Sequence, residues 1–268
     1  PGAPSSAITW TPDGTSVVFN RNGGGGGGRA AGAPGGSRGA GGGTPPVPGT
    51  PGTQAAGGGF GGGGPQTVTI ADGTIKPLNG MGGTFPIYTL AGDQIATLGG
   101  GGGGVSVAPA SGGPAKSLGQ AIDRGIARAL WMPDGKSLIV GANDTSTVSL
   151  WQVPLDGPAT KLDLGGASPN SSFYVDMNIS RAGAIAFAGS TPMRPAELYV
   201  MTSPTASARP LTHVNADIAE LSLGKTEVVN WTNDKFEENG LLTYPPDFNP
   251  SQKYPLVLYI HGGPRAAS

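Results

Sequence analysis

The sequence predicts a mostly β protein: a partial β-propeller of about four blades, followed by the first strands of a domain of α/β type. Three observations lead to this fold class. A strand–turn–strand pattern recurs along the first two hundred residues, a second strand pair follows each copy, and one continuously apolar run lies near the end of the chain. Repeats at a fixed period indicate an array of similar supersecondary units.

The recurring unit is a tight Pro-Asp-Gly turn between two strands. Residues 10–19 read Trp-Thr-Pro-Asp-Gly-Thr-Ser-Val-Val-Phe, and residues 131–140 read Trp-Met-Pro-Asp-Gly-Lys-Ser-Leu-Ile-Val. Proline presets the first torsion of the turn, and glycine supplies the positive φ that the turn requires. Degenerate copies with the same layout begin at Tyr88 and Ile179.

The second element of each copy is an apolar strand, a turn and a basic residue shortly before a leucine. Leu150 follows Trp131 by 19 positions, and Leu198 follows Ile179 by the same 19 positions. An interval that recurs in this way indicates one structural unit with four strands. The basic residues of the four copies are Lys76, Lys116, Lys161 and Arg209.

The spacing of the copies is typical of propeller blades. Tyr88, Trp131 and Ile179 are 43 and 48 positions apart, and the longer step from Trp10 contains a glycine-rich tract at 23–64. Four-stranded blades repeat about every 40–50 residues. We expect 23–64 to be a disordered insertion in the first blade, because glycine loses the most backbone entropy on ordering. The run Gly99–Gly104 is expected to be a shorter turn; a β-sandwich is the alternative fold.

Composition narrows the functional classes. The chain has 268 residues with 50 Gly and 26 Pro, a formal net charge of −1 and no cysteine. No basic cluster is present, which argues against nucleic acid as a partner. The absence of cysteine excludes disulfides and thiolate metal sites, and no cofactor or metal is implied. The longest strongly apolar run is far shorter than the roughly 20 residues of a membrane span.

The character of the sequence changes after residue 215, so we expect a propeller domain at 1–215 and a linker with the start of a second domain at 216–268. Strand-like segments follow at 227–232, 240–244 and 254–260. The run 256–260 is continuously apolar, as in a strand that is buried on both faces. It leads directly into the sequence His261-Gly-Gly-Pro264.

These last segments resemble the entry to the catalytic domain of the prolyl oligopeptidase (S9) family, which includes acylaminoacyl peptidases and dipeptidyl peptidases. The resemblance is carried by residues 209–264 and above all by Tyr-Pro-Leu-Val-Leu-Tyr-Ile-His-Gly-Gly-Pro at 254–264. It implies an α/β-hydrolase domain with a Ser-His-Asp triad and a peptide or acyl-peptide substrate. One departure from the family is Lys235, where the family usually has glycine after the aspartate.

The same resemblance assigns the candidate site. The backbone N–H groups of Gly262 and Gly263 are the expected oxyanion donors, Gly263 being the closer match, and such a donor follows the third strand of an α/β-hydrolase. His261 and Pro264 are expected to support the loop. His213 is expected to be a solvated or packing residue.

No part of the chain matches the segments that carry the family's catalytic serine, acid and histidine. We expect these three residues to lie beyond Ser268, so the chain as given is expected to be inactive. Ser37 lies in a formal G-x-S-x-G pattern, but it stands inside the glycine-rich tract, where such a match arises by chance. A nucleophile elbow also needs a buried strand before it and a helix after it.

Two other functions stay open at this point. One is a non-catalytic propeller that binds a protein or peptide, and the other is a carboxylesterase of the hydrolase superfamily. The resemblance implies export for relatives with glycine-rich insertions, which favours the bacterial periplasm or secretion over the cytoplasm.

Overall fold

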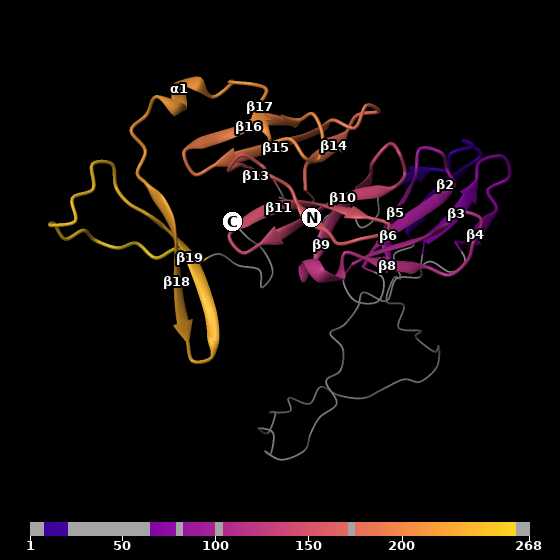
Figure 1. Cartoon of the computed structure of the whole chain (residues 1–268), viewed down its shortest axis with the longest axis horizontal. Coiled ribbons are helices and arrows are strands. Elements are labelled where there is room, and N and C mark those ends of the chain that lie inside the picture. Colours follow the sequence, from indigo (N-terminus) through magenta and orange to yellow (C-terminus); the bar gives the residue numbers. More distant parts are fainter. Residues whose placement is uncertain (1–7, 21–64, 79–82, 100–103, 171–174, 261–268) are drawn as a thin grey trace, which may run out of the picture.

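The computed structural model describes residues 8–20, 65–78, 83–99, 104–170 and 175–260 of the chain. Within these ranges the protein is mostly β, with four successive antiparallel sheets and one separate hairpin. The sheets follow one another in chain order and lie side by side (Figure 1). This is the arrangement of blades in a partial β-propeller, as the sequence predicts, rather than the two stacked sheets of a sandwich.

The first three blades are simple meanders in which each strand pairs with the next. The expected insertion at 23–64 lies outside the described residues, between the second and third strands of the first blade. The strands are β1 (Thr9–Trp10), β2 (Ser16–Asn20), β3 (Pro65–Thr69) and β4 (Ile75–Pro77); β5 (Thr84–Tyr88), β6 (Gln94–Leu98), β7 (Val105–Pro109) and β8 (Lys116–Leu118); and β9 (Ile126–Trp131), β10 (Ser137–Asp144), β11 (Thr147–Pro154) and β12 (Thr160–Lys161).

The fourth blade has a divided innermost strand. Two short strands both pair with β15, one at each of its ends, and β16 and β17 complete the sheet. A 3-10 turn, η1 (Gln120–Ile122), precedes the third blade, and a short helix, α1 (Ala216–Ala219), follows the fourth. The strands of the fourth blade are β13 (Ser168–Pro169), β14 (Met177–Ile179), β15 (Ile185–Thr191), β16 (Arg194–Met201) and β17 (Arg209–Pro210).

The predicted basic positions are equivalent in three dimensions. Each basic residue lies in the outermost strand of its blade and pairs with the neighbouring strand, β3, β7, β11 or β16. The four residues are Lys76, Lys116, Lys161 and Arg209. The Leu162 N–H donates to the Leu150 carbonyl over 2.9 Å, and the Leu211 N–H donates to the Leu198 carbonyl over 2.7 Å. The interval of 19 residues therefore reflects a true structural repeat.

The hydrophobic core lies between neighbouring blades. One apolar cluster joins the second and third blades and another joins the third and fourth. In β10 the first six residues, Ser137–Ala142, are all buried, because this strand is covered on both faces. Gly141 permits a close approach of the fourth blade to β10, since a Cβ there would lie 2.8 Å from Val175 Cγ1.

The chain beyond the blades forms a hairpin of β18 (Thr226–Asn233) and β19 (Phe236–Thr243), which projects away from the blades (Figure 1). Two of the three strands expected after residue 216 are therefore present. The third expectation was wrong: residues 254–260 form no strand. Leu256–Ile260 are 77–88% exposed. A strand of this type requires neighbours on both edges and both faces, and no described segment supplies them.

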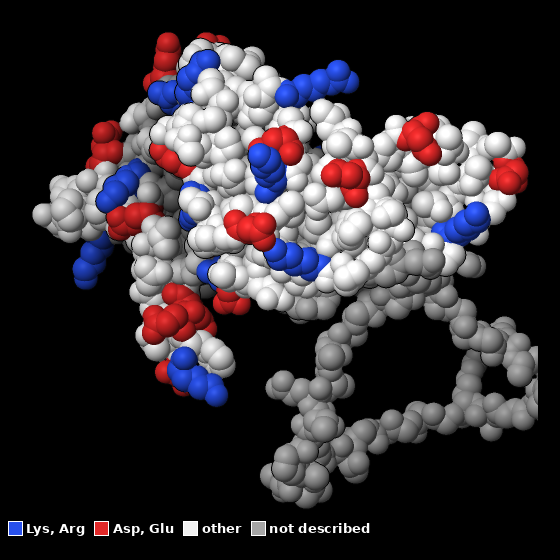
Figure 2. Space-filling view, turned by 45° about the vertical axis from the view of Figure 1, so that its right-hand side comes forward, with Lys and Arg blue, Asp and Glu red and all other residues white. Residues whose placement is uncertain are grey.

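Charged side chains are mixed on the face shown in Figure 2, where Lys and Arg alternate with Asp and Glu rather than forming a patch of one sign. Among the described residues, no helix is long and apolar enough to cross a membrane. The same part of the chain contains no cluster of three or more His, Cys, Asp or Glu residues able to hold a metal ion.

Candidate functional site

The residues that the sequence singles out for oxyanion binding cannot be placed. His261, Gly262, Gly263 and Pro264 lie outside the described residues. The described chain ends at Ile260, which is 80% exposed. The roles expected of these four residues therefore stay predictions.

The expected position of the catalytic triad is not tested by the structure either. Ser268, beyond which we expect the serine, acid and histidine, lies outside the described residues. Ser37, which stands in the formal G-x-S-x-G pattern, lies outside them as well. The triad beyond Ser268 and the dismissal of Ser37 as a nucleophile both stay predictions.

A buried carboxylate fixes the segment that leaves the fourth blade. Glu197 in β16 is 8% exposed and accepts hydrogen bonds from the Thr212 hydroxyl, the Val214 N–H (3.1 Å) and the Asn215 N–H (2.8 Å). The hydrogen bond from Thr212, followed by those from the two backbone amides, holds the pKa of Glu197 below its usual value. Glu197 is therefore the anchor of residues 212–215.

Two further hydrogen bonds complete this anchor. The Leu198 N–H donates to the Thr212 hydroxyl over 3.0 Å, and the Asn215 side-chain amide donates to the Ala196 carbonyl over 2.8 Å. His213, in contrast, is exposed and lies at the edge of a small cavity beside Glu197. This position agrees with the expectation of a solvated residue.

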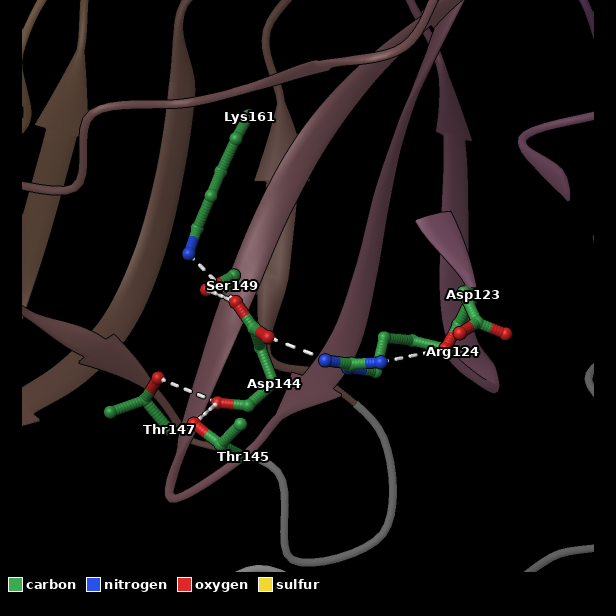
Figure 3. Close-up of polar contacts among 7 residues, drawn as sticks. All are labelled: Asp123, Arg124, Asp144, Thr145, Thr147, Ser149 and Lys161. Atoms are coloured by element: carbon green, nitrogen blue, oxygen red, sulfur yellow. Dashed lines mark hydrogen bonds and ion pairs between the residues drawn. The ribbon is translucent and has the colours of Figure 1, made fainter. Parts of the chain in front are cut away.

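A second carboxylate, Asp144 in β10, lies among cations (Figure 3). Its side chain contacts Lys161 Nζ at 2.7 Å, Ser149 Oγ at 3.1 Å and Arg124 Nε at 3.4 Å. The hydrogen bond from Lys161 is the main cause that lowers the pKa of Asp144. A carboxylate stabilised in its ionised form is a poor proton donor, so this cluster joins β10, β12 and the segment after η1 rather than serving acid catalysis.

Each of the four blades carries an equivalent turn, which joins β1 to β2, β5 to β6, β9 to β10 and β14 to β15. In each turn one backbone N–H donates to the carbonyl four or five residues later. A glycine with positive φ lies between the donor and the acceptor. The Pro-Asp-Gly turns of the first and third blades thus have structural equivalents in the second and fourth blades, where the sequence is degenerate. The closing bonds run from Thr11 to Ser16 (2.9 Å), Thr89 to Gln94 (3.0 Å), Met132 to Ser137 (2.9 Å) and Ser180 to Ala184 (2.8 Å).

The turns of the second and third blades each pack on the turn of the preceding blade. A Cβ on Gly92 would lie 2.6 Å from Pro12 Cβ, and one on Gly135 would lie 3.4 Å from Thr89 Cγ2. The Trp131 ring is fixed by its Nε1–H, which donates to the Ile87 carbonyl of the second blade over 3.2 Å. Gly92 is therefore required both for its positive φ and for the space between the first two blades.

A pocket of about 490 Å³ opens where the four turns meet. Its walls are mainly apolar, and Arg181 is the one charged residue among the described residues that line it. Ligand sites typically enclose about 300–1,000 Å³ with apolar walls and few polar groups, so this pocket has the size and character of a binding site. The aromatic side chains around it belong to Trp10, Tyr88 and Trp131.

The pocket and the exit of the chain lie at opposite ends of the fourth blade. Ile179, which lines the pocket, pairs with Ile185, and Ile185 pairs with Met201 at the end of β16. Residues 212–215 instead contact Glu197 and its neighbours near the beginning of β16. The chain therefore leaves the blades at the end remote from the pocket.

Sequence reasoning did not identify Glu197 or Arg181. Arg181 occupies the position that Pro12 and Pro133 hold in the clear copies of the turn, so an alignment of the repeats marks it as a charged residue at an otherwise apolar position. Glu197 has no comparable signal. Its partners at 212–215 follow it by at least 15 residues and meet it only through the folding of β17.

The chain is similar in sequence to dipeptidyl-peptidases. It is 29% identical over 156 residues to a probable dipeptidyl-peptidase 5 of Aspergillus clavatus, which covers 54% of this chain and 20% of the relative. It is 27% identical over 139 residues to dipeptidyl-peptidase 5 of Porphyromonas gingivalis, covering 50% and 19%. The matched stretch thus spans about a fifth of the length of these relatives, and no family model matches the chain.

Solved structures share the fold. An acylaminoacyl peptidase in complex with Z-Gly-Gly-Phe-chloromethyl ketone matches with a TM-score of 0.62 and 17% identity, covering 98% of this chain and 36% of that chain. A prolyl endopeptidase matches with a TM-score of 0.51 and 16% identity, covering 87% and 30%. The likeness in sequence is thus to dipeptidyl-peptidases, and the fold is shared with an acylaminoacyl peptidase and a prolyl endopeptidase, in agreement with the resemblance to the prolyl oligopeptidase (S9) family.

Proposed function

We propose that residues 1–268 belong to a serine peptidase that cleaves short peptides or acyl-peptides. The observation that carries the proposal is the 29% identity over 156 residues to a dipeptidyl-peptidase 5. The order of the elements supports it, because a partial propeller precedes the hairpin and the segment that leads into His261-Gly-Gly-Pro264. The proposal includes a division into two domains at 215/216.

In this proposal the peptide N–H groups of Gly262 and Gly263 donate to the oxyanion that forms when a serine attacks the substrate carbonyl. His261 and Pro264 hold that loop in shape. The serine, acid and histidine of the triad lie beyond Ser268 in the parent protein. We therefore expect this chain alone to be inactive.

The blades contribute in two ways. The anchor at Glu197 fixes where the chain leaves the fourth blade, which supports a defined position for the segment that follows. The packed turns fix one end of the array of blades. A rigid propeller beside a hydrolase domain restricts access to short substrates, which is the property that the resemblance implies.

The test uses the parent protein that contains residues 1–268 and a dipeptidyl or acetyl-aminoacyl p-nitroanilide as substrate. Replacement of Gly263 by Pro removes one N–H donor, and we expect kcat to fall about 100–1,000-fold with little change in KM. Ser37→Ala is the matched control and should leave kcat unchanged.

Labelling with a fluorophosphonate separates the possible outcomes. We expect the parent protein to be labelled at a serine beyond Ser268 and residues 1–268 alone to remain unlabelled. Labelling of residues 1–268, or loss of activity in Ser37→Ala, would overturn the assignment of the triad. Faster turnover of an acyl ester than of the anilides would instead favour the esterase.

A further inference from the structure

The pocket between the four turns has one unusual position. The residues after Thr11, Thr89 and Met132 are Pro12, Leu90 and Pro133, whereas the residue after Ser180 is Arg181. These four side chains line the same pocket at equivalent places in their turns. A guanidinium therefore stands where the other three blades present an apolar side chain.

Arg181 is available to a ligand. It is exposed at the pocket, and no acidic residue of the described chain lines the pocket beside it. Among the described residues it makes no ion pair or hydrogen bond. An arginine in this situation presents parallel N–H donors that match the two oxygens of a carboxylate.

The remaining wall fits an apolar side chain. Trp10 is 58% exposed at the pocket, whereas Trp131 is 8% exposed and has its ring held in place by the hydrogen bond to Ile87. Leu90 is 64% exposed and adds further apolar surface. Large apolar side chains that remain accessible in a concave site, rather than packed, favour the binding of an aromatic or aliphatic group.

We propose that this pocket binds the C-terminal residue of a short peptide. The carboxylate pairs with Arg181, and the apolar side chain of the same residue lies against Trp10 and Leu90. The volume of about 490 Å³ accommodates one or two residues and not a folded partner. This binding does not depend on the peptidase proposal, because every residue invoked lies within the blades.

The decisive comparison uses two ligands that differ in one group. Acetyl-glycyl-leucyl-phenylalanine with a free carboxylate and the same peptide with a C-terminal amide are titrated into the 268-residue chain by isothermal titration calorimetry. We expect the acid to bind about tenfold more tightly than the amide, because only the acid offers a charged partner to the guanidinium. Added salt should reduce this difference.

Two variants locate the site. In Arg181→Gln the acid should bind about tenfold more weakly, to the level of the amide, while binding of the amide stays unchanged. Arg209→Gln removes the same charge from the outermost strand of the same blade and should leave the tenfold preference intact. Trp10→Ala should weaken both peptides alike, since it removes apolar surface.

Near-ultraviolet circular dichroism checks that each variant keeps the packed blades. The proposal is overturned by equal affinities of acid and amide for the unmodified chain, or by no saturable binding of either. It is equally overturned if Arg181→Gln and Arg209→Gln weaken the acid to the same extent, because the preference would then reflect net charge rather than a site. Activity of the parent protein enters none of these readouts.

Discussion

The third blade and the blades at either end share one sequence pattern, yet they bury it to different extents. Trp131 is 8% exposed, whereas its equivalent Trp10 in the first blade is 58% exposed. Leu150 of the third blade is fully buried, whereas its equivalent Leu198 in the fourth is 47% exposed. The sequence pattern therefore determines where the strands and turns form. Whether a side chain of the pattern is buried depends on the presence of a neighbouring sheet. The stability of this chain should accordingly be concentrated at the junctions between blades.

The largest difference is expected between Leu150→Ala and Leu198→Ala. Removal of the Leu150 side chain leaves a cavity between packed sheets and should lower the free energy of unfolding by about 3 kcal/mol. The same change at Leu198 should lower it by less than about 1 kcal/mol, because that side chain is already half in water. Urea unfolding followed by circular dichroism measures both values. Equal losses would show that the fourth blade has a covering that the described residues do not supply.

The turns allow a second matched comparison. Gly92 and Gly14 have φ values of 76° and 68°, so alanine is strained by about 1 kcal/mol at either position. A Cβ on Gly92 would also lie 2.6 Å from Pro12, whereas one on Gly14 would meet nothing within 4 Å.

We therefore expect Gly92→Ala to lower the free energy of unfolding by about 2–3 kcal/mol and Gly14→Ala by about 1 kcal/mol, measured by the same urea titration. Because both variants carry the same backbone strain, the difference between them isolates the contact between the first and second blades. If the two losses were the same, the turns would not be packed against each other as the structure shows.

These comparisons also show what the sequence can reveal. The turns at residues 11–14 and 132–135 were predicted correctly because their proline, aspartate and glycine act within four residues. The strand expected at 254–260 was wrong because such a strand depends on neighbours far along the chain. The pocket at Arg181 was missed for a related reason: its walls come from four blades, and no single stretch of sequence contains them.

The segment that leaves the fourth blade is held by polar contacts instead of apolar packing, and its response to pH should be the smallest and most local effect. The hydrogen bonds from Thr212, Val214 and Asn215 lower the pKa of Glu197 relative to the unfolded chain. A lowered pKa means that the ionised form is stabilised in the folded state. This contribution is complete above the unfolded pKa, near 4.5, and is lost as the pH falls through the folded value.

Hydrogen exchange of the Val214 and Asn215 amides tests this anchor. After correction for the intrinsic dependence of exchange on pH, their protection should be constant near pH 7 and should decrease as the pH falls below about 4.5. Glu197→Gln should reduce protection at pH 7 and abolish this decrease, because glutamine does not titrate. Protection of the β10 amides, which depends on burial, should change in neither case. A parallel loss in β10 would mean that acid unfolds the blades as a whole, and Glu197 would then not be a local anchor.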